Sequence, residues 1–208
     1  MKSSESVIGI ILAGGLAKRM GGGDKCLLPL AGKTLLQRTI ERAQPQVAQL
    51  VLNANGSSLR FARTRLPVIA DSFANNLGPL AGVHAGLKWM ATHYPQQEWL
   101  ASFASDTPFF PTTLVEQLHQ RAQAVTSSHV ILATSKQQVH PVFALWHVSL
   151  FEKIEEQLQT GEVPRLQDFV NAQKPEHVDF AESGYDPFFN INTPQDLYKA
   201  EPLAALVK

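Results

Sequence analysis

A short apolar run that opens into a glycine-rich, basic loop constrains the fold of this chain more than any other feature. Residues 7–12 read Val-Ile-Gly-Ile-Ile-Leu, which is typical of a strand buried on both faces of a parallel sheet. Glycines let backbone N–H groups turn toward a bound anion, and cations neutralise its charge. The strand and loop therefore predict a triphosphate site. The loop contains five glycines and three cations: Gly14, Gly15, Gly21, Gly22, Gly23, Lys18, Arg19 and Lys25.

The spacing of this loop excludes two common phosphate-binding motifs. A Walker A loop requires Ser or Thr directly after its lysine, whereas Cys26 follows Lys25 here. A dinucleotide fingerprint requires three glycines at fixed offsets, and residues 18–20 interrupt the glycines of this loop. Because Cys26 neighbours Lys25, a lowered thiol pKa is conceivable, but we interpret this cysteine as incidental to the chemistry.

Strand-like and helix-like segments alternate along the 208 residues, which predicts α/β layers around a mostly parallel sheet in a single domain of 1–208. We expect the nucleotide-binding half at about 7–110 and the acceptor-binding half at about 111–200. Strands are expected at 7–12, 47–53, 66–70, 99–104, 129–134 and 142–146. Helices are expected at 34–44, 79–94, from 112 or 113 to 125, at 150–158, at 165–170 and from Thr193-Pro194 onward.

Polar residues follow four consecutive predicted strands. Leu12 leads into the glycine-rich loop, and the next three strands are followed by Asn53, Asp71 and Asp106. Ligands of open α/β sheets bind outside the carboxyl ends of the strands. Asp106 is suited to hold Mg²⁺, which prefers oxygen ligands and takes few of them from protein. Each of these polar residues alone could equally be a turn former, so the prediction depends on their convergence.

The composition argues against nucleic-acid-binding and membrane-spanning classes of protein. Eighteen Lys and Arg balance eighteen Asp and Glu, so the broad basic face that nucleic-acid binding requires is not expected. No stretch approaches 18 apolar residues, which argues against a membrane span. Cys26 is the single cysteine and cannot form an intramolecular disulfide, which together with a weak match to a signal peptide favours a cytoplasmic location.

The motifs, taken in order, resemble a known family. Residues 12–15 (Leu-Ala-Gly-Gly), 19–21 (Arg-Met-Gly) and 24–25 (Asp-Lys) are similar to nucleotidyltransferases that use an NTP and release pyrophosphate. With Gly-Pro-Leu-Ala-Gly at 78–82, Asp-Thr-Pro at 106–108 and Asn-Ile-Asn-Thr-Pro at 190–194, the chain resembles the molybdenum cofactor guanylyltransferases. The resemblance extends from about Val7 to Leu197, is looser between Ser149 and Phe188, and departs from the family pattern around 161–168.

This resemblance implies a three-layer Rossmann-like fold, Mg²⁺ as cofactor, and transfer of GMP from GTP to the terminal phosphate of molybdenum-bound molybdopterin. Molybdopterin-supplying proteins and molybdoenzyme-maturation proteins are expected as partners. The implied catalytic residues are Asp106, Lys25 and Arg19, with Asp106 as the metal ligand. The implied nucleotide-binding residues are Leu12, Ala13, Gly14, Gly15, Lys25, Asn53, Asp71, Gly78 and Asp106, and the acceptor-binding residues are His140, Pro141, Arg165, Asn190 and Asn192.

Several alternatives stay open. Asp71 could accept hydrogen bonds from the guanine edge or from the ribose hydroxyls. A cytidylyltransferase of the same fold acting on molybdopterin is the nearest rival, although the Leu-Ala-Gly-Gly segment favours GTP. Sugar-1-phosphate nucleotidyltransferases usually carry a further domain. A non-catalytic nucleotide-binding partner of molybdoenzymes is disfavoured because Lys25 and Asp106 are both present.

Overall fold

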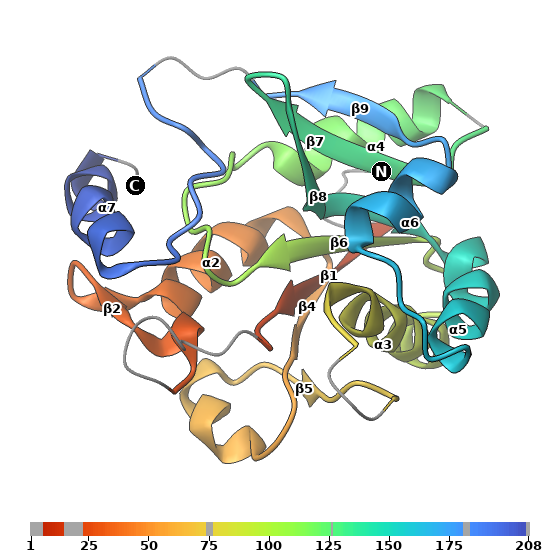
Figure 1. Ribbon diagram of the computed structural model, residues 1–208, viewed down its shortest axis with the longest axis horizontal. Coiled ribbons are helices and arrows are strands. Elements are labelled where there is room, and N and C mark those ends of the chain that lie inside the picture. The colour runs from red at the N-terminus through yellow and green to blue at the C-terminus, as the bar shows by residue number, and fades with distance from the viewer. Residues whose placement is uncertain (1–5, 15–22, 74–76, 126, 181–183, 207–208) are drawn as a thin grey trace.

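A seven-stranded sheet organises the computed structural model, which describes residues 6–14, 23–73, 77–125, 127–180 and 184–206. Figure 1 shows the sheet at the centre of the molecule, with the strand order β5-β4-β1-β6-β8-β7-β9. Every neighbouring pair is parallel except those that involve β8, so six strands share one direction. The strands are β1 Val7–Leu12, β4 Gln49–Asn53, β5 Val68–Ile69, β6 Trp99–Ala104, β7 Val130–Ser135, β8 Gln138–His147 and β9 Glu176–Asp179.

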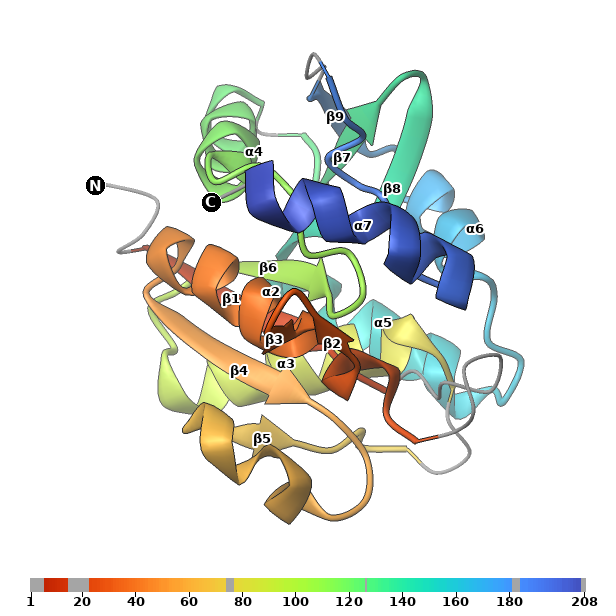
Figure 2. The same cartoon turned by 90° about the vertical axis from the view of Figure 1, so that its left-hand side faces the viewer.

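Helices cover both faces of this sheet. Helices α2 and α4 pack on one face, and α3, α5 and α6 pack on the other (Figures 1 and 2). Helix α7 packs against a two-stranded hairpin at one end of the molecule. The bounds are α2 Leu35–Ala43, α3 Pro79–His93, α4 Leu114–Ala124, α5 Phe151–Gln159, α6 Leu166–Ala172 and α7 Pro194–Leu206, with the hairpin formed by β2 Pro29–Leu30 and β3 Lys33–Thr34.

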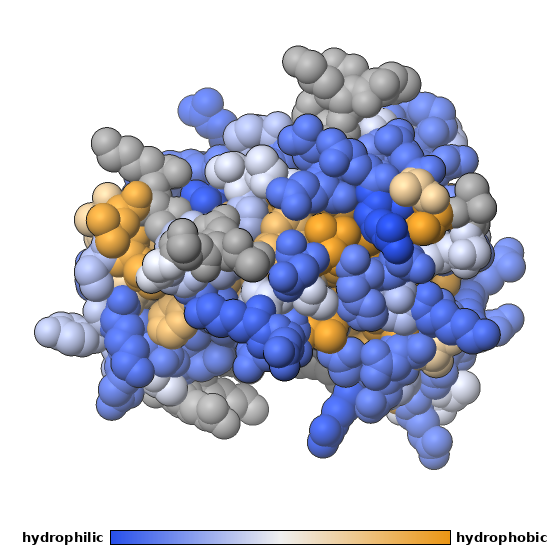
Figure 3. Space-filling model, turned by 90° about the horizontal axis from the view of Figure 1, so that it is seen from above, coloured by the Kyte–Doolittle hydropathy of each residue, from blue (hydrophilic) through white to orange (hydrophobic). Residues whose placement is uncertain are grey.

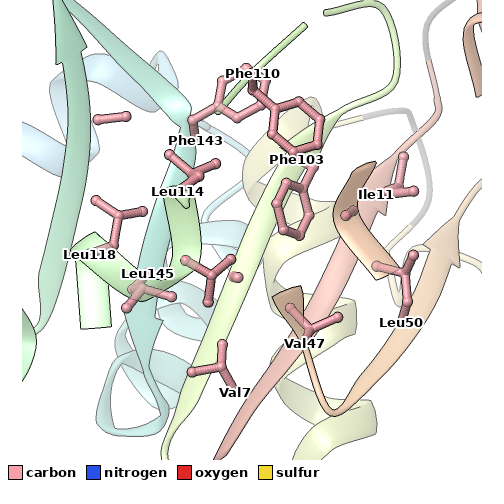
Figure 4. Packing of buried hydrophobic residues seen from close by; sticks show 14 of the residues in the cluster. Val7, Ile11, Val47, Leu50, Phe103, Phe110, Leu114, Leu118, Phe143 and Leu145 are labelled. Carbon is pink, nitrogen blue, oxygen red and sulfur yellow. The ribbon is translucent and has the colours of Figure 1, made fainter. Parts of the chain in front are cut away.

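The core explains why the first strand is apolar throughout. Val7 and Ile11 contribute to the cluster beneath α2 and α4, whereas Ile8 and Ile10 contribute to the cluster beneath α3, α5 and α6. Figure 4 shows the first of these clusters, in which β1 side chains lie among those of α4, β6 and β8. Burial on both faces excludes polar side chains from this strand, so its ligand-binding groups can lie only beyond its carboxyl end.

Local capping fixes the starts of two helices. The Thr34 hydroxyl accepts from the Gln37 N–H at 3.1 Å, and the Gln37 side chain accepts from the Thr34 N–H at 2.8 Å, which is a capping box for α2. At α7 the Thr193 hydroxyl accepts from the Asp196 N–H at 3.2 Å. The predicted start of a helix at Thr193-Pro194 is therefore confirmed, with Pro194 as the first helical residue.

The predicted α/β fold with a mostly parallel, mixed sheet is confirmed. Among the β-structure, strand β9 and the β2–β3 hairpin were not predicted, and neither were the short 3-10 helices, of which Ser58–Thr64 is the longest. Strand β9 is a short edge strand of alternating half-buried and exposed residues, so it lacks the apolar run that identified the other strands. The β2–β3 hairpin has only two residues in each strand and turns through Ala31 and Gly32, both with positive φ.

The surface in the view of Figure 3 is mostly hydrophilic, with small separate hydrophobic patches rather than one broad band. Within the described residues, no helix combines the length and apolar character needed to cross a bilayer.

Candidate functional site

A cleft of about 340 Å³ opens at the carboxyl ends of the central parallel strands. The four strand ends singled out from the sequence all contribute to it, because the register of β1 with β4 and β6 places Leu12, Asn53 and Ala104 side by side. The cleft is lined by Leu12, Gly14, Lys25, Asn53, Asn55, Asp71, Gly78, Pro79, Ala104, Ser105, Asp106, Val142 and Asn190.

A buried lysine lies at the centre of one end of this cleft. Lys25 Nζ donates to Asp106 Oδ2 at 2.6 Å, to Asn192 Oδ1 at 2.5 Å and, more weakly, to Asn190 Oδ1 at 3.4 Å. Only 8 % of Lys25 is exposed, so its charge is compensated by these three oxygens rather than by bulk water. Residues predicted separately for phosphate, metal and acceptor binding thus form one polar cluster, which we call the Lys25 cluster (Lys25, Asp106, Asn190 and Asn192).

Backbone contacts hold the members of the Lys25 cluster in place. The Ser105 N–H donates to the Leu12 carbonyl at 3.4 Å, which extends the pairing of β6 with β1 as far as Asp106. The Asp106 carbonyl accepts from the Ile191 N–H at 3.0 Å, so the segment before α7 is attached directly to the residue that follows β6. Ile191 is fully buried. This anchor places the flanking Asn190 and Asn192 beside Lys25.

The donor atoms of the Lys25 cluster fit a hard divalent cation. Asp106, Asn190 and Asn192 converge on the Lys25 cation with carboxylate or amide oxygens, the ligand atoms that Mg²⁺ prefers. Within the described part of the chain, Asp106 Oδ1 accepts a single long hydrogen bond, 3.3 Å, from the Thr107 hydroxyl. The carboxylate is 22 % exposed and therefore accessible to a ligand from the cleft. Among the described residues no group of three or more His, Cys, Asp or Glu side chains could hold a metal alone, so a cation here would also need ligands such as water or an anion in the cleft.

The other end of the cleft is built around the Asp71 carboxylate. Asn53 Nδ2 donates to Asp71 Oδ1 at 2.9 Å, and Asn55 Nδ2 donates to Asp71 Oδ2 at 2.7 Å. The Asn55 side-chain oxygen accepts from the Asp71 N–H at 2.9 Å. Asn53 also donates to the Ile69 carbonyl at 3.3 Å, so its amide is fixed from two directions. Asp71 is only partly buried and faces the cleft with a fixed orientation.

Helix α3 closes the cleft beside Asn53. Gly78 is its N-cap with φ +80°, a left-handed conformation that glycine adopts without strain, and Pro79 is the first helical residue. Within the described residues no side chain caps this terminus; Pro79 has no N–H and the Ala81 N–H donates to the Gly78 carbonyl at 3.1 Å, so the Leu80 N–H remains for an anionic or polar ligand. Gly82 permits close packing, since a Cβ there would lie 2.4 Å from Asn53 Oδ1.

The predicted acceptor residues do not all reach the cleft. His140 is half-buried, accepts or donates one hydrogen bond with the Ser135 hydroxyl at 2.8 Å, and stacks on Phe188 with ring centroids 4.2 Å apart. Burial lowers the pKa of His140. Pro141 follows it on β8, and Arg165 is exposed at the N-cap of α6. None of these three is among the residues that line the 340 Å³ cleft.

Two of the predicted residues lie outside the described residues, namely Gly15 and Arg19. Ala13 is buried, and its N–H donates to the Asn53 carbonyl at 2.9 Å. The conceivable lowering of the Cys26 pKa is wrong: burial, with Asp24 nearby, raises the pKa of this thiol to about 12. Cys26 is 1 % exposed and belongs to the hydrophobic core.

Sequence reasoning missed two residues that organise the site. Asn55 follows Asn53 at a spacing of two, which for extended backbone places both side chains on the same side. Arg60 links the two ends of the cleft: its Nε is 2.7 Å from Asp24 Oδ2, and its terminal nitrogens donate to the Asn55 and Ser57 carbonyls at 2.5 and 2.9 Å. The Asn-x-Asn spacing was a usable signal for Asn55, whereas nothing local indicated Arg60.

Comparison with known proteins finds a matching family model and closely similar sequences. The model of the MobA-like NTP transferase domain matches residues 9–178. A protein of Nitrobacter hamburgensis named molybdenum cofactor guanylyltransferase is 44 % identical over 198 residues, covering 95 % of this chain and 94 % of that protein. One from Rhodopseudomonas palustris with the same name is 46 % identical over 195 residues, covering 94 % and 91 % of the two chains.

Among solved structures, the chain is similar to the molybdopterin-guanine dinucleotide biosynthesis protein A of Archaeoglobus fulgidus. The TM-score is 0.74 at 22 % identity, with 96 % of this chain and 99 % of that chain covered. At this identity the likeness supports the fold, including the mixed central sheet.

Proposed function

This chain belongs to the molybdenum cofactor guanylyltransferases, within the MobA-like NTP transferases, and we propose that it uses the strand-end cleft to transfer GMP from GTP to the terminal phosphate of molybdenum-bound molybdopterin. The chain is accordingly an enzyme of the nucleotidyltransferase class, and its reaction releases pyrophosphate. GTP and the molybdenum cofactor are its substrates.

One observation carries the assignment of this reaction to the cleft. The Lys25 cluster lies at one end and the Asp71 carboxylate, fixed by Asn53 and Asn55, lines the same cavity. A nucleoside triphosphate is anionic at one end and carries neutral hydrogen-bond donors at the other. In the proposed complex the phosphates contact Lys25, and the nucleoside donates to Asp71.

The chemistry demands charge compensation and positioning rather than a general base. The acceptor phosphate is already anionic at neutral pH, so no proton needs to be removed before it attacks the α-phosphate of GTP. Lys25 would neutralise negative charge on the triphosphate, and the N–H groups of the loop near Gly14 and of the start of α3 would orient its oxygens. Arg19 is proposed to contact the departing pyrophosphate, because its guanidinium can bind two phosphate oxygens at once.

A divalent metal is expected in this family, and we propose Mg²⁺ with Asp106 as its protein ligand. Asn190 and Asn192 stand beside Asp106 with amide oxygens that could complete a hard-oxygen site. When bound, the metal would compensate negative charge on the phosphates of the substrate. Lys25 Nζ contacts the same oxygens, so Lys25 and a bound metal would both compensate negative charge at this end of the cleft.

The acceptor is proposed to approach from the side of Asn190 and β8, where Val142 and Asn190 line the cleft. His140, Pro141 and Arg165 lie outside its lining, so their contact with molybdopterin would involve a part of that ligand that projects beyond the cleft. We further propose a cytoplasmic enzyme that exchanges molybdopterin and its product with other maturation proteins.

The assignment is tested with purified protein, Mg²⁺ and molybdenum-loaded molybdopterin, supplied in turn with GTP, CTP, ATP or UTP. Pyrophosphate release with GTP alone supports the proposal. Release with CTP in preference to GTP would identify the cytidylyl reaction instead, and GTP binding without any release would indicate a non-catalytic binder.

A further inference from the structure

Asn55 makes a reciprocal contact with Asp71 that no other residue described here makes. Its side-chain N–H donates to Asp71 Oδ2 at 2.7 Å while its side-chain oxygen accepts from the Asp71 N–H at 2.9 Å. One amide therefore fixes both the backbone and the carboxylate of Asp71. Asparagine is suited to this position because an aspartate would face the Asp71 carboxylate with like charge.

These contacts determine which lone pairs of Asp71 remain for a ligand. An ionised carboxylate accepts about four hydrogen bonds, two at each oxygen. Asn53 uses one position on Oδ1 and Asn55 uses one on Oδ2. The remaining positions are thus distributed over both oxygens, and the plane of the carboxylate cannot rotate without breaking a hydrogen bond. Such a carboxylate is complementary to two neighbouring donors on a single ligand.

The backbone of Asn55 is held in place by Arg60. Arg60 donates to the Asn55 carbonyl at 2.5 Å, and the same guanidinium pairs with Asp24 at 2.7 Å. Asp24 directly precedes Lys25 in the chain. Arg60 thus connects the residue next to Lys25 with the backbone of Asn55, and the Asn55 side chain in turn contacts Asp71.

We propose that Asn55 is a positioning residue that holds Asp71 as a paired acceptor for two adjacent donors of the nucleoside. This inference rests on the proposed function, since it assumes that Asp71 contacts the nucleoside of GTP. The adjacent donors are either N1–H and N2–H₂ of guanine or the 2′ and 3′ hydroxyls of the ribose. Asn55 contributes through Asp71 and need not touch the nucleotide.

The test compares ligands that contain or lack the nucleoside. Isothermal titration calorimetry in the presence of Mg²⁺ measures binding of GTP and of inorganic tripolyphosphate to the wild type, Asn55→Ala, Asp71→Ala and the double variant. The matched control is Asn171→Ala, which removes an exposed asparagine of α6. Loss of one hydrogen bond to a charged group predicts about a tenfold or greater loss of GTP affinity in Asn55→Ala, with tripolyphosphate affinity unchanged.

The double variant separates positioning from general destabilisation. If Asn55 acts through Asp71, Asn55→Ala costs no further GTP affinity once Asp71 is alanine. Equal losses for GTP and tripolyphosphate, or additive losses in the double variant, would overturn the inference. Normal GTP binding by Asp71→Ala would instead overturn the nucleoside role of Asp71 in the proposed function. A weakened Asp71→Ala beside an unaffected Asn55→Ala would overturn only the role of Asn55.

Two analogues identify the paired donors. Inosine triphosphate lacks the guanine amino group, and 2′-deoxy-GTP lacks one ribose hydroxyl. For each ligand the measured quantity is the loss of binding affinity caused by Asn55→Ala. This loss should be smaller for the analogue that lacks a contacted donor than for GTP. Identical losses for GTP and both analogues would contradict a paired contact with Asp71.

Discussion

Gly82 of α3 lies so close to Asn53 of β4 that a Cβ on the glycine would be 2.4 Å from Asn53 Oδ1 and 2.8 Å from Leu12 Cδ2. The Asn53 side chain cannot simply move aside, because its amide donates to Asp71 and to the Ile69 carbonyl. The first turn of α3 and the Asp71 end of the cleft are therefore packed as one unit. A substitution at Gly82 should therefore change the orientation of the Asp71 carboxylate.

Gly82→Ala is expected to weaken GTP binding even though alanine is the better helix former by about 1 kcal/mol. The added methyl displaces Asn53 and with it the orientation of Asp71. Gly86→Ala is the matched control, since its Cβ would meet Ile10 and Leu100 at 2.8 Å in the core, away from the residues that line the cleft. Both variants should unfold at lower urea concentration than the wild type. Only Gly82→Ala should lose GTP affinity by calorimetry, and equal affinities for the two variants would contradict the coupling.

Lys25→Met should reduce GTP affinity by about tenfold to a hundredfold, because one charge-assisted contact to phosphate is lost. Binding of guanosine, which carries no phosphate, should be nearly unchanged. Lys33→Met is the control, since Lys33 pairs with Glu41 on the exposed surface. If Lys25→Met bound GTP as tightly as Lys33→Met does, the triphosphate would not contact the Lys25 cluster.

Arg60→Met should weaken GTP binding without removing any group that lines the cleft. The guanidinium ties Asp24 to the carbonyls of Asn55 and Ser57, so its loss frees both ends of the cleft. Arg63→Met changes an exposed arginine of the same 3-10 helix, Ser58–Thr64, and should leave affinity unchanged. Fluorescence titration with a labelled GTP analogue measures both, and indistinguishable affinities would show that Arg60 is only a surface residue.

The buried His84 predicts loss of stability in acid. Its ring is fully buried and stacks on Phe151 with centroids 4.8 Å apart, and its nearest polar neighbour within the described residues is Glu155 Oε1, 3.5 Å from Nε2, too far for a well-formed hydrogen bond. Burial lowers the pKa of His84, and Glu155 opposes this effect only in part. The unfolded chain therefore binds the proton more readily, and the free energy of unfolding falls as the pH decreases below the ordinary value of 6.5.

Urea denaturation at pH 7.5 and pH 5.5 measures this effect. His84→Leu should show a smaller decrease in the free energy of unfolding between the two pH values than the wild type shows. His177→Leu, which replaces an exposed histidine of β9, should retain the full decrease. The same pH dependence in wild type and His84→Leu would assign the acid sensitivity to other groups.

The strand ends were predictable because burial on both faces forces polar ligand groups beyond the carboxyl ends of parallel strands. That rule correctly placed Asn53, Asp71 and Asp106 in one cleft with Leu12. Strand β9 was not predictable from its own residues, since its pairing with β7 depends on neighbours distant in the chain.

The pairing of Lys25 with Asn192 could not be predicted either. The two residues are 167 positions apart, and the Ile191 N–H reaches the Asp106 carbonyl only in the folded chain. Motif resemblance predicts Asn190 and Asn192 on the acceptor side, and in the folded chain their side-chain oxygens accept from Lys25. Spacing along the sequence carries no information about which of several polar side chains will contact the ammonium group of one lysine.

The most direct test of the cleft as the site of transfer is a single-turnover assay with Asp106→Asn. Asparagine retains the shape of the side chain but removes the charge that would hold the metal. The measurement is transfer of label from α-³²P-GTP to molybdenum-loaded molybdopterin, and the control is Asp179→Asn at an exposed position of β9. By analogy with the loss of one preorganised charge-stabilising contact, the rate with Asp106→Asn should fall by about 10²–10³ while the melting temperature stays near that of the wild type. Transfer at the rate of Asp179→Asn would contradict the account, because the metal and the reacting phosphates would then lie elsewhere.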